Sequence, residues 1–154
     1  MSPSDAPSIV DELAAFDRLL EVGIGRRPDV ARALADRACD VIAIDVDEAA
    51  LATHDGPYRT GRGDVVALAE AVDPLATLPV DSDDAGFDAV YGLNLPAELQ
   101  RPTVETARRL DAACAFTTLG FEEPVVPVRR RSLTEGTLYV ARQRDGDDPR
   151  RSRP

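Results

Sequence analysis

The residues best suited to chemistry lie in one short stretch, where a carboxylate and two glycines precede a helix-forming segment. Glu21 is followed by Gly23 and Gly25, and a second carboxylate, Asp45, closes the apolar run at 41–44. Glycines let the chain turn sharply and let a ligand approach the backbone. The free N–H groups at the start of the next helix attract a polar or anionic group. The spacing predicts a nucleotide site in which Asp45 accepts hydrogen bonds from ribose hydroxyls.

The elements that must position these residues alternate between strands and helices. We expect strands at 19–22, 41–44, 58–61, 87–93 and 114–119, and helices at 9–16, 28–38, 47–53, 65–72 and 97–111. Because Pro102 sits inside the last of these helices, we expect one loose turn and a proper start at that proline. Two more strands, at 125–130 and 137–142, should form a hairpin through a loop at 132–136. The pattern predicts an α/β fold: a three-layer, Rossmann-like, mostly parallel sheet with a C-terminal antiparallel hairpin.

The organisation along the chain indicates a single domain over 8–142. We expect a loose N-terminus at 1–7, an acidic loop at 81–86 and a disordered charged tail at 143–154. In open α/β sheets the ligand crevice lies past the carboxyl ends of the strands, where the strand order reverses. The residues expected to share that edge are Gly23, Gly25, Asp45, Asp64 and Asn94.

The composition is strongly acidic. There are 28 acidic residues against 18 basic ones, a formal charge of -10, and every basic residue is Arg. This charge argues against a nucleic-acid phosphate backbone as the main partner, and self-repulsion destabilises the fold unless salt screens it. We find no apolar run of membrane-spanning length and no signal peptide, so we expect a cytoplasmic protein. An acidic chain without Lys resembles proteins of salt-accumulating haloarchaea.

The cysteines and the histidine predict no metal site. Cys39 and Cys114 are isolated among apolar or small residues, where a buried thiol is the default. His54 is the one histidine of the chain and stands beside Asp55 and Gly56 in a turn. We expect it to be exposed and without a role.

Three charged clusters have two interpretations each. Arg26 and Arg27, at a helix start, could recruit a carboxylate or phosphate or could be surface charges. The pair at 122–123 (Glu-Glu) could do acid–base work, but a solvated loop is expected. The run at 129–131 (Arg-Arg-Arg) could bind an anion or nucleic acid, but we expect edge-strand charges that block sheet-to-sheet pairing.

The pattern Glu21-x-Gly23-x-Gly25 resembles motif I of the class I S-adenosylmethionine-dependent methyltransferases. The resemblance covers roughly residues 17–119. It implies that the acidic residue and the glycine loop hold the methionyl part of the cofactor, and that Asp45 holds the ribose hydroxyls. It also implies that Asp64, after a glycine, contacts the adenine amino group.

The segment after the fourth expected strand carries the rest of the resemblance. The residues at 87–90 (Phe-Asp-Ala-Val) resemble the start of motif IV, where amino-group methyltransferases often show N/D-P-P-Y/F. This chain has Asn94 and Pro96 but lacks the second proline and the aromatic residue. The resemblance implies that Asn94 would face the methyl acceptor. The stretch at 91–99, with Glu98 near its end, and the short length also resemble a small archaeal family of uncharacterised proteins with this fold.

Three functions remain open. The first is a minimal S-adenosylmethionine-binding domain, which as an enzyme would transfer a methyl group by in-line attack without a metal. The second is a non-catalytic nucleotide-binding or regulatory protein with a degenerate Rossmann fold, favoured by the incomplete motif IV and the lack of an inserted lid. The third is a NAD-type dinucleotide protein. Pro28 in place of a third glycine and the presence of Glu21 count against it.

Overall fold

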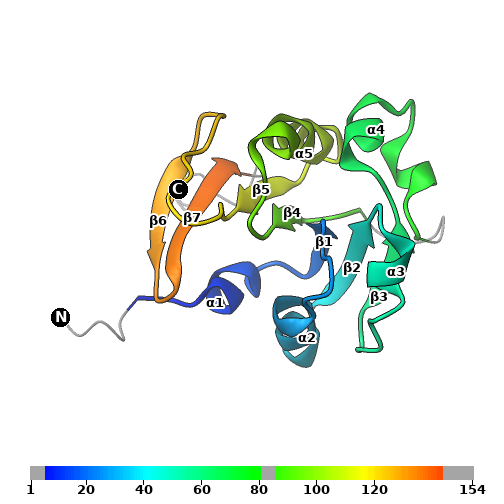
Figure 1. Cartoon of the computed structure of the whole chain (residues 1–154), viewed down its shortest axis with the longest axis horizontal. Coiled ribbons are helices and arrows are strands. Elements are labelled where there is room, and N and C mark those ends of the chain that lie inside the picture. The colour runs from blue at the N-terminus through cyan, green and yellow to red at the C-terminus, as the bar shows by residue number, and fades with distance from the viewer. Residues whose placement is uncertain (1–5, 81–85, 144–154) are drawn as a thin grey trace, which may run out of the picture.

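A seven-stranded sheet in the order β3-β2-β1-β4-β5-β7-β6 forms the centre of the computed structural model, which describes residues 6–80 and 86–143 (Figure 1). The strands are β1 (Arg18–Val22), β2 (Asp40–Asp45), β3 (Arg59–Arg62), β4 (Ala89–Gly92), β5 (Ala113–Phe116), β6 (Arg129–Leu133) and β7 (Gly136–Arg142). The first five are parallel, and β7 runs antiparallel to both β5 and β6. The predicted parallel α/β sheet and its C-terminal hairpin are confirmed.

Helices pack on both faces of the sheet and complete three layers. They are α1 (Ile9–Leu13), α2 (Asp29–Asp36), α3 (Glu48–Leu51), α4 (Val65–Glu70) and α5 (Ala97–Arg109), with a 3₁₀ helix, η2, at Pro74–Thr77. The apolar side chains of α1 and α2 join one core, and those of α4 and α5 join the other. Figure 1 shows these two pairs of helices on opposite sides of the sheet. The sheet therefore separates two hydrophobic cores.

The central strands are mostly apolar because both of their faces are covered. All five residues of β1 are buried, as are the four of β4. Within β1, Leu20 and Val22 enter one core and Leu19 enters the other, as the period of two in a strand requires. Arg18 and Glu21 are the exceptions in this pattern, since both are buried ionisable side chains in an otherwise apolar strand.

Several predicted boundaries are wrong, and the fifth strand, for example, ends at Phe116 rather than at residue 119. The first helix ends at Leu13 rather than at residue 16. The helix after β4 runs without a break through Pro102, since its buried face packs on α4 and the sheet and outweighs one lost hydrogen bond. The sixth strand starts at Arg129 rather than 125, because Pro127 has no N–H to give to the ladder.

The hairpin loop is also shorter than predicted. The pairing of β6 with β7 continues to Leu133 and Gly136, which leaves a turn of two residues, Thr134 and Glu135. The predicted N-terminus at 1–7, acidic loop at 81–86 and tail at 143–154 lie mostly outside the described residues. Across 6–80 and 86–143, we find no helix with the length and apolarity needed to cross a membrane.

Candidate functional site

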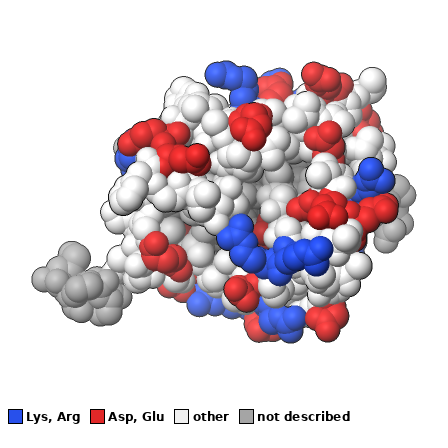
Figure 2. Space-filling model, in the orientation of Figure 1, with Lys and Arg blue, Asp and Glu red and all other residues white. Residues whose placement is uncertain are grey.

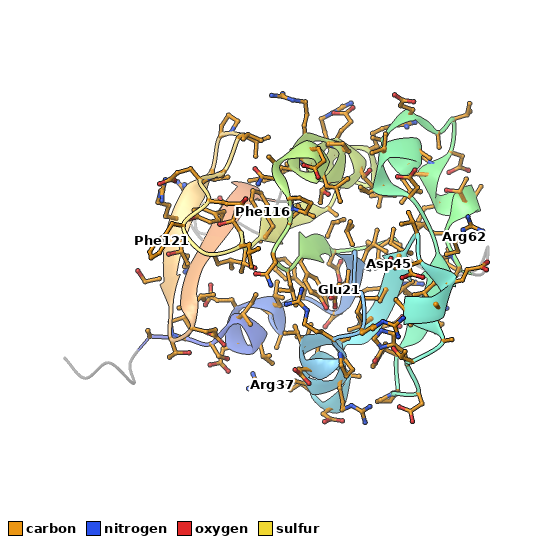
Figure 3. All side chains as sticks on the ribbon, in the orientation of Figure 1. Glu21, Arg37, Asp45, Arg62, Phe116 and Phe121 are labelled. Atoms are coloured by element: carbon orange, nitrogen blue, oxygen red, sulfur yellow. The ribbon has the colours of Figure 1, made fainter. Side chains whose placement is uncertain are left out.

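The site residues predicted from the sequence converge on the carboxyl edge of the sheet. The strand order reverses between β1 and β4, the place where a ligand crevice is expected. Glu21 lies in β1, Asp45 ends β2, and Asn94 follows β4. In Figure 3, Glu21 and Asp45 lie near one another at the middle of the molecule. One edge thus gathers groups from separate parts of the chain.

The glycine loop after β1 has a backbone that favours glycine. Gly23 and Gly25 have φ angles of +72° and +60°, and no heavy atom lies within 4 Å of where a Cβ would stand on either residue. The N–H of Gly23 donates to the carbonyl of Ile44 over 2.9 Å, which ties the loop to β2. The loop is therefore held in place while the space over its two glycines stays open to a ligand.

Asp45 holds the glycine loop from the neighbouring strand. One carboxylate oxygen accepts from the N–H of Gly25 at 2.7 Å, and the other accepts from the N–H of Asp47 at 2.9 Å. A carboxylate oxygen accepts more than one hydrogen bond, so both oxygens keep capacity for a ligand hydroxyl. Asp45 thus shapes the loop and presents acceptors at the same edge.

Glu21 and Tyr91 form a hydrogen-bonded pair beneath the loop. They face each other across β1 and β4, and the Tyr91 hydroxyl donates to the Glu21 carboxylate at 2.6 Å. Glu21 is 1 % exposed, and burial raises its pKa to about 7 against the opposing effects of the Tyr91 hydrogen bond and the charge of Arg27. Burial and the neighbouring Glu21 also raise the pKa of Tyr91. Tyr91 packs in the sheet as part of β4, and the sequence did not reveal its pairing with Glu21.

Arg27 reaches across the crevice to the end of β4. With its amide oxygen turned toward the guanidinium, Asn94 accepts from Arg27 Nη1 at 2.6 Å and from Nη2 at 3.3 Å. The Asn94 N–H donates to Thr117 Oγ1 at 2.8 Å, which anchors this residue in its positive-φ conformation of 52°. The guanidinium is also close enough to Glu21 to lower its pKa. Arg27 therefore belongs to the site, which the sequence had left open.

A cleft of about 730 Å³ adjoins Arg27 and Asn94, and of the site residues predicted from the sequence only Asn94 lines it. Arg27 and Asn94 line one side of it, Thr117 and Tyr139 line the sheet side, and the exposed ring of Phe121 stands at its rim. Figure 2 shows a hollow near the centre of the molecule with arginine side chains beside it. Pockets of a few hundred cubic ångströms hold small molecules, so the volume suits a ligand of nucleoside size.

Asp64 lies farther along the same edge. It is exposed, and its carboxylate caps α4 by accepting from the N–H of Val66 at 2.9 Å. Gly63 before it packs closely on β2, because a Cβ there would lie 3.2 Å from the Ile44 side chain. The capping bond is a structural role, and a contact from Asp64 to adenine stays a prediction.

The expectation for His54 is wrong. This side chain is partly buried, and its ring nitrogens lie 2.7 Å from the Gly25 carbonyl oxygen and 2.6 Å from the Tyr58 hydroxyl. The carbonyl accepts, so Nε2 donates to it and fixes the ring orientation. His54 therefore holds the glycine loop through the Gly25 carbonyl, a contact that local sequence patterns do not reveal.

The remaining candidates have surface or core positions. Glu98 and the pair at 122–123 are exposed, and Glu123 forms an ion pair with Arg130 at 2.7 Å. Cys39 and Cys114 are buried free thiols, as predicted. In the part of the chain that the structure describes, no three His, Cys, Asp or Glu side chains are grouped as metal ligands would be.

Comparison with known proteins gives two kinds of likeness. UPF0146 proteins from two strains of Halobacterium salinarum are 45% identical over 137 residues, covering 88% of this chain and 95% of theirs. A TehB-like SAM-dependent methyltransferase from Corynebacterium glutamicum has a TM-score of 0.56 at 13% identity, covering 83% of this chain and 80% of its own. A chain of a fibrillarin/Nop5p complex also has a TM-score of 0.56, at 10% identity, and the match covers 83% of this chain and 72% of that one.

These solved structures are too distant in sequence to show more than the fold, which is that of class I methyltransferases. The sequence itself, by contrast, shows the family. The model of the uncharacterised protein family UPF0146 matches residues 4–144, which include every residue that the structure describes, and the two relatives reported above are haloarchaeal. This chain belongs to the uncharacterised protein family UPF0146.

Proposed function

We propose that this protein binds an adenosine-containing ligand, S-adenosylmethionine or a close relative, at the carboxyl edge of β1, β2 and β4. The observation that carries the proposal is the open space over Gly23 and Gly25, bordered by the carboxylate of Asp45 at the point where the strand order reverses. The fold likeness to a SAM-dependent methyltransferase supports the same class of ligand.

The charged groups of the site suit the amino-acid end of such a ligand. Glu21 is an acid beneath the loop, and Arg27 is a cation that reaches across the crevice. An ammonium group would interact with the Glu21 carboxylate, directly or through water, and a carboxylate would pair with the Arg27 guanidinium. Ribose hydroxyls would donate to Asp45, and Asp64 would lie toward the adenine.

Methyl transfer is the reaction that this ligand would serve. The acceptor's lone pair would form a bond to the methyl carbon while the carbon–sulfur bond breaks, its electrons returning to the sulfonium sulfur. The acceptor's proton would then pass to solvent. This chemistry depends mainly on positioning, and Asn94 would orient the acceptor.

A second candidate is a nucleotide-binding protein without catalysis. The contact between Arg27 and Asn94 favours it, because the guanidinium already occupies the amide oxygen that would orient an acceptor. A ligand that pairs with Arg27 would have to release Asn94 before that residue could act. Binding and catalysis therefore need separate tests.

Calorimetric titration of the full chain in molar KCl tests binding with four ligands: S-adenosylmethionine, S-adenosylhomocysteine, methylthioadenosine and NAD. We expect S-adenosylhomocysteine to bind more tightly than methylthioadenosine, which lacks the amino-acid end. Arg27→Gln should weaken the binding of S-adenosylhomocysteine by about tenfold, because one charge-assisted hydrogen bond is lost. The affinity for methylthioadenosine should not change. Arg26→Gln is the matched control and should change neither affinity.

No binding of any adenosyl ligand to the folded protein would overturn the proposal. Binding of NAD alone would establish a dinucleotide protein instead. Where S-adenosylmethionine binds, incubating it in methyl-labelled form with the metabolite, RNA and protein fractions of a haloarchaeal extract tests catalysis. Label that enters a fraction with this protein but not with Asn94→Ala identifies an enzyme. Tight binding with no transfer identifies the non-catalytic candidate.

A further inference from the structure

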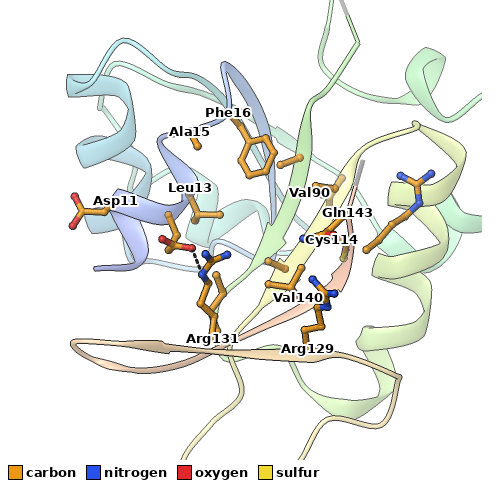
Figure 4. Close-up of a pocket in the computed structure, with 16 residues that line it drawn as sticks. Asp11, Leu13, Ala15, Phe16, Val90, Cys114, Arg129, Arg131, Val140 and Gln143 are labelled. Atoms are coloured by element: carbon orange, nitrogen blue, oxygen red, sulfur yellow. Dashed lines mark ion pairs between the residues drawn. The ribbon is translucent and has the colours of Figure 1, made fainter. Parts of the chain in front are cut away.

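A second cleft, of about 660 Å³, lies between α1 with the segment after it and the β6–β7 hairpin (Figure 4). Its floor includes Ala89 and Ala113, the first residues of β4 and β5, so it opens toward the amino ends of these strands. The candidate nucleotide site lies at their carboxyl ends. The two clefts share no lining residue.

Small residues leave this space open. Ala15, Ala89, Ala113 and Ala115 line it, and each has only a methyl side chain. Larger apolar side chains also line it, namely Leu13, Phe16, Val90, Leu138 and Val140. Water gains few hydrogen bonds from such walls, so an apolar group is the better occupant.

One rim of the cleft is basic. The register of the hairpin sets Arg129 opposite Val140 and Arg131 opposite Leu138. Directly opposed residues of antiparallel strands project from the same face, so both guanidinium groups stand on the face of the cleft. Arg142, two residues beyond Val140 on β7, adds a third. Figure 4 shows Arg129 and Arg131 at this rim.

The three arginines differ in their partners. Arg131 pairs with Glu12 across the cleft at 2.8 Å (Figure 4), and Arg142 binds the Ala112 carbonyl and Asp111. Across residues 6–80 and 86–143, the Arg129 side chain has no hydrogen bond and no ion pair, although its backbone belongs to the β6–β7 ladder. The other acid of the lining, Asp11, pairs with Arg37 at 2.8 Å. The cleft thus offers one unpaired guanidinium beside an apolar interior.

We propose that this cleft binds a small amphiphilic carboxylate, with the carboxylate on Arg129 and the hydrocarbon body over Phe16 and the alanine floor. An inorganic anion would leave the apolar walls unused, and a neutral hydrocarbon would leave the guanidinium unused. A chain of formal charge -10 repels anions in general, so the arginines supply the local attraction that such a ligand needs. The proposal does not rest on the nucleotide site.

Octanoate and octanol are matched probes, since they share a hydrocarbon body and differ in the charged head. Both would be titrated into the full chain at the lowest KCl concentration that keeps it folded, because salt screens the exposed guanidinium. We expect octanoate to bind at least about tenfold more tightly than octanol, and the difference to shrink as KCl rises.

Two substitutions on the same strand distinguish binding at this cleft from a general effect of the protein's charge. Arg129→Gln should weaken octanoate by about tenfold and leave octanol unchanged. Arg130→Gln removes the same charge from the opposite face of the strand, where the guanidinium lies over the Tyr139 ring. This substitution should leave the affinities for octanoate and octanol unchanged. Ala15→Leu, at an exposed position that lines the cleft, should weaken both probes by filling the space.

Equal affinity for octanoate and octanol would overturn the proposal, as would equal effects of the two arginine substitutions. Absence of octanoate binding to the folded protein would also overturn it. Addition of S-adenosylhomocysteine should not displace octanoate, since the clefts lie at opposite ends of the strands. Failure of the nucleotide ligands to bind would leave the octanoate results unaffected, which keeps the two proposals distinguishable.

Discussion

The hydroxyl of Tyr91 donates a hydrogen bond of 2.6 Å to the carboxylate of Glu21, and both side chains are buried between β1 and β4. A single hydrogen bond offsets only part of the cost of burying a carboxylate, and the pKa of Glu21 is therefore raised to about 7. The charge at the base of the candidate nucleotide site thus changes near neutral pH, where a ligand amine would meet it.

This raised pKa predicts that stability falls as pH rises. Between the ordinary value of 4.5 and about 7 the folded state binds more protons than the unfolded chain, so the free energy of unfolding decreases across that interval and levels off above it. The loss amounts to about 3 kcal/mol for a shift of this size. Glu21→Gln keeps an acceptor for Tyr91 but cannot ionise, so its stability should lack this decrease.

Urea denaturation of both proteins at pH 5 and pH 8, at one KCl concentration, checks the effect. The two should be similar at pH 5, and Glu21→Gln should be the more stable at pH 8. Tyr91→Phe removes the donor that lowers the pKa of Glu21, so the decrease in stability between pH 5 and pH 8 should be larger in this variant than in the wild type. Parallel pH profiles for wild type and Glu21→Gln would contradict the assignment.

The glycine loop predicts a stability cost that comes from backbone conformation and not from a clash. Gly25→Ala should destabilise by about 1 kcal/mol, because a Cβ at positive φ is strained even where no atom lies within 4 Å. Gly86→Ala is a matched control, since its Cβ would also meet open space and its φ lies outside the positive range. Thermal unfolding should separate the two, and equal melting temperatures would show that the loop relaxes without cost.

The hydrogen bonds of His54 predict that two substitutions lower stability by different amounts. His54→Ala removes the hydrogen bonds to both the Gly25 carbonyl and the Tyr58 hydroxyl, whereas Tyr58→Phe removes one of them. We expect the free energy of unfolding to decrease by about 1–2 kcal/mol in His54→Ala and by about half of that in Tyr58→Phe. Amide hydrogen exchange should also show faster exchange in the loop of His54→Ala, and unchanged protection there would argue against its supporting role.

The acidic surface predicts that stability rises with KCl. A formal charge of -10 repels itself in the compact state, and molar salt shortens the screening length to about 3 Å. The midpoint of thermal unfolding should increase from low to molar KCl. A variant with the exposed Glu98 and Glu122 replaced by Gln should depend less on salt. A flat midpoint across this range would contradict the prediction.

The sequence by itself determined the fold class and the edge of the sheet at which the candidate site residues meet. Unbroken apolar runs predicted buried parallel strands, and the positions of Gly23, Gly25, Asp45 and Asn94 at strand ends predicted a shared edge. Both inferences hold because they depend on local pattern and on the rule that carboxyl ends of parallel strands meet. The family resemblance is confirmed at the level of UPF0146 and its methyltransferase-like fold.

Only the tertiary structure decided which side chains meet. The register of β1 against β4 paired Tyr91 with Glu21, and the packing of separate segments brought His54 under the glycine loop and Arg27 across to Asn94. Local periodicity carries no information on such contacts, because a shift of one residue in strand pairing turns a side chain to the other face. The same register set Arg129 over an apolar cleft that the run of three arginines alone did not indicate.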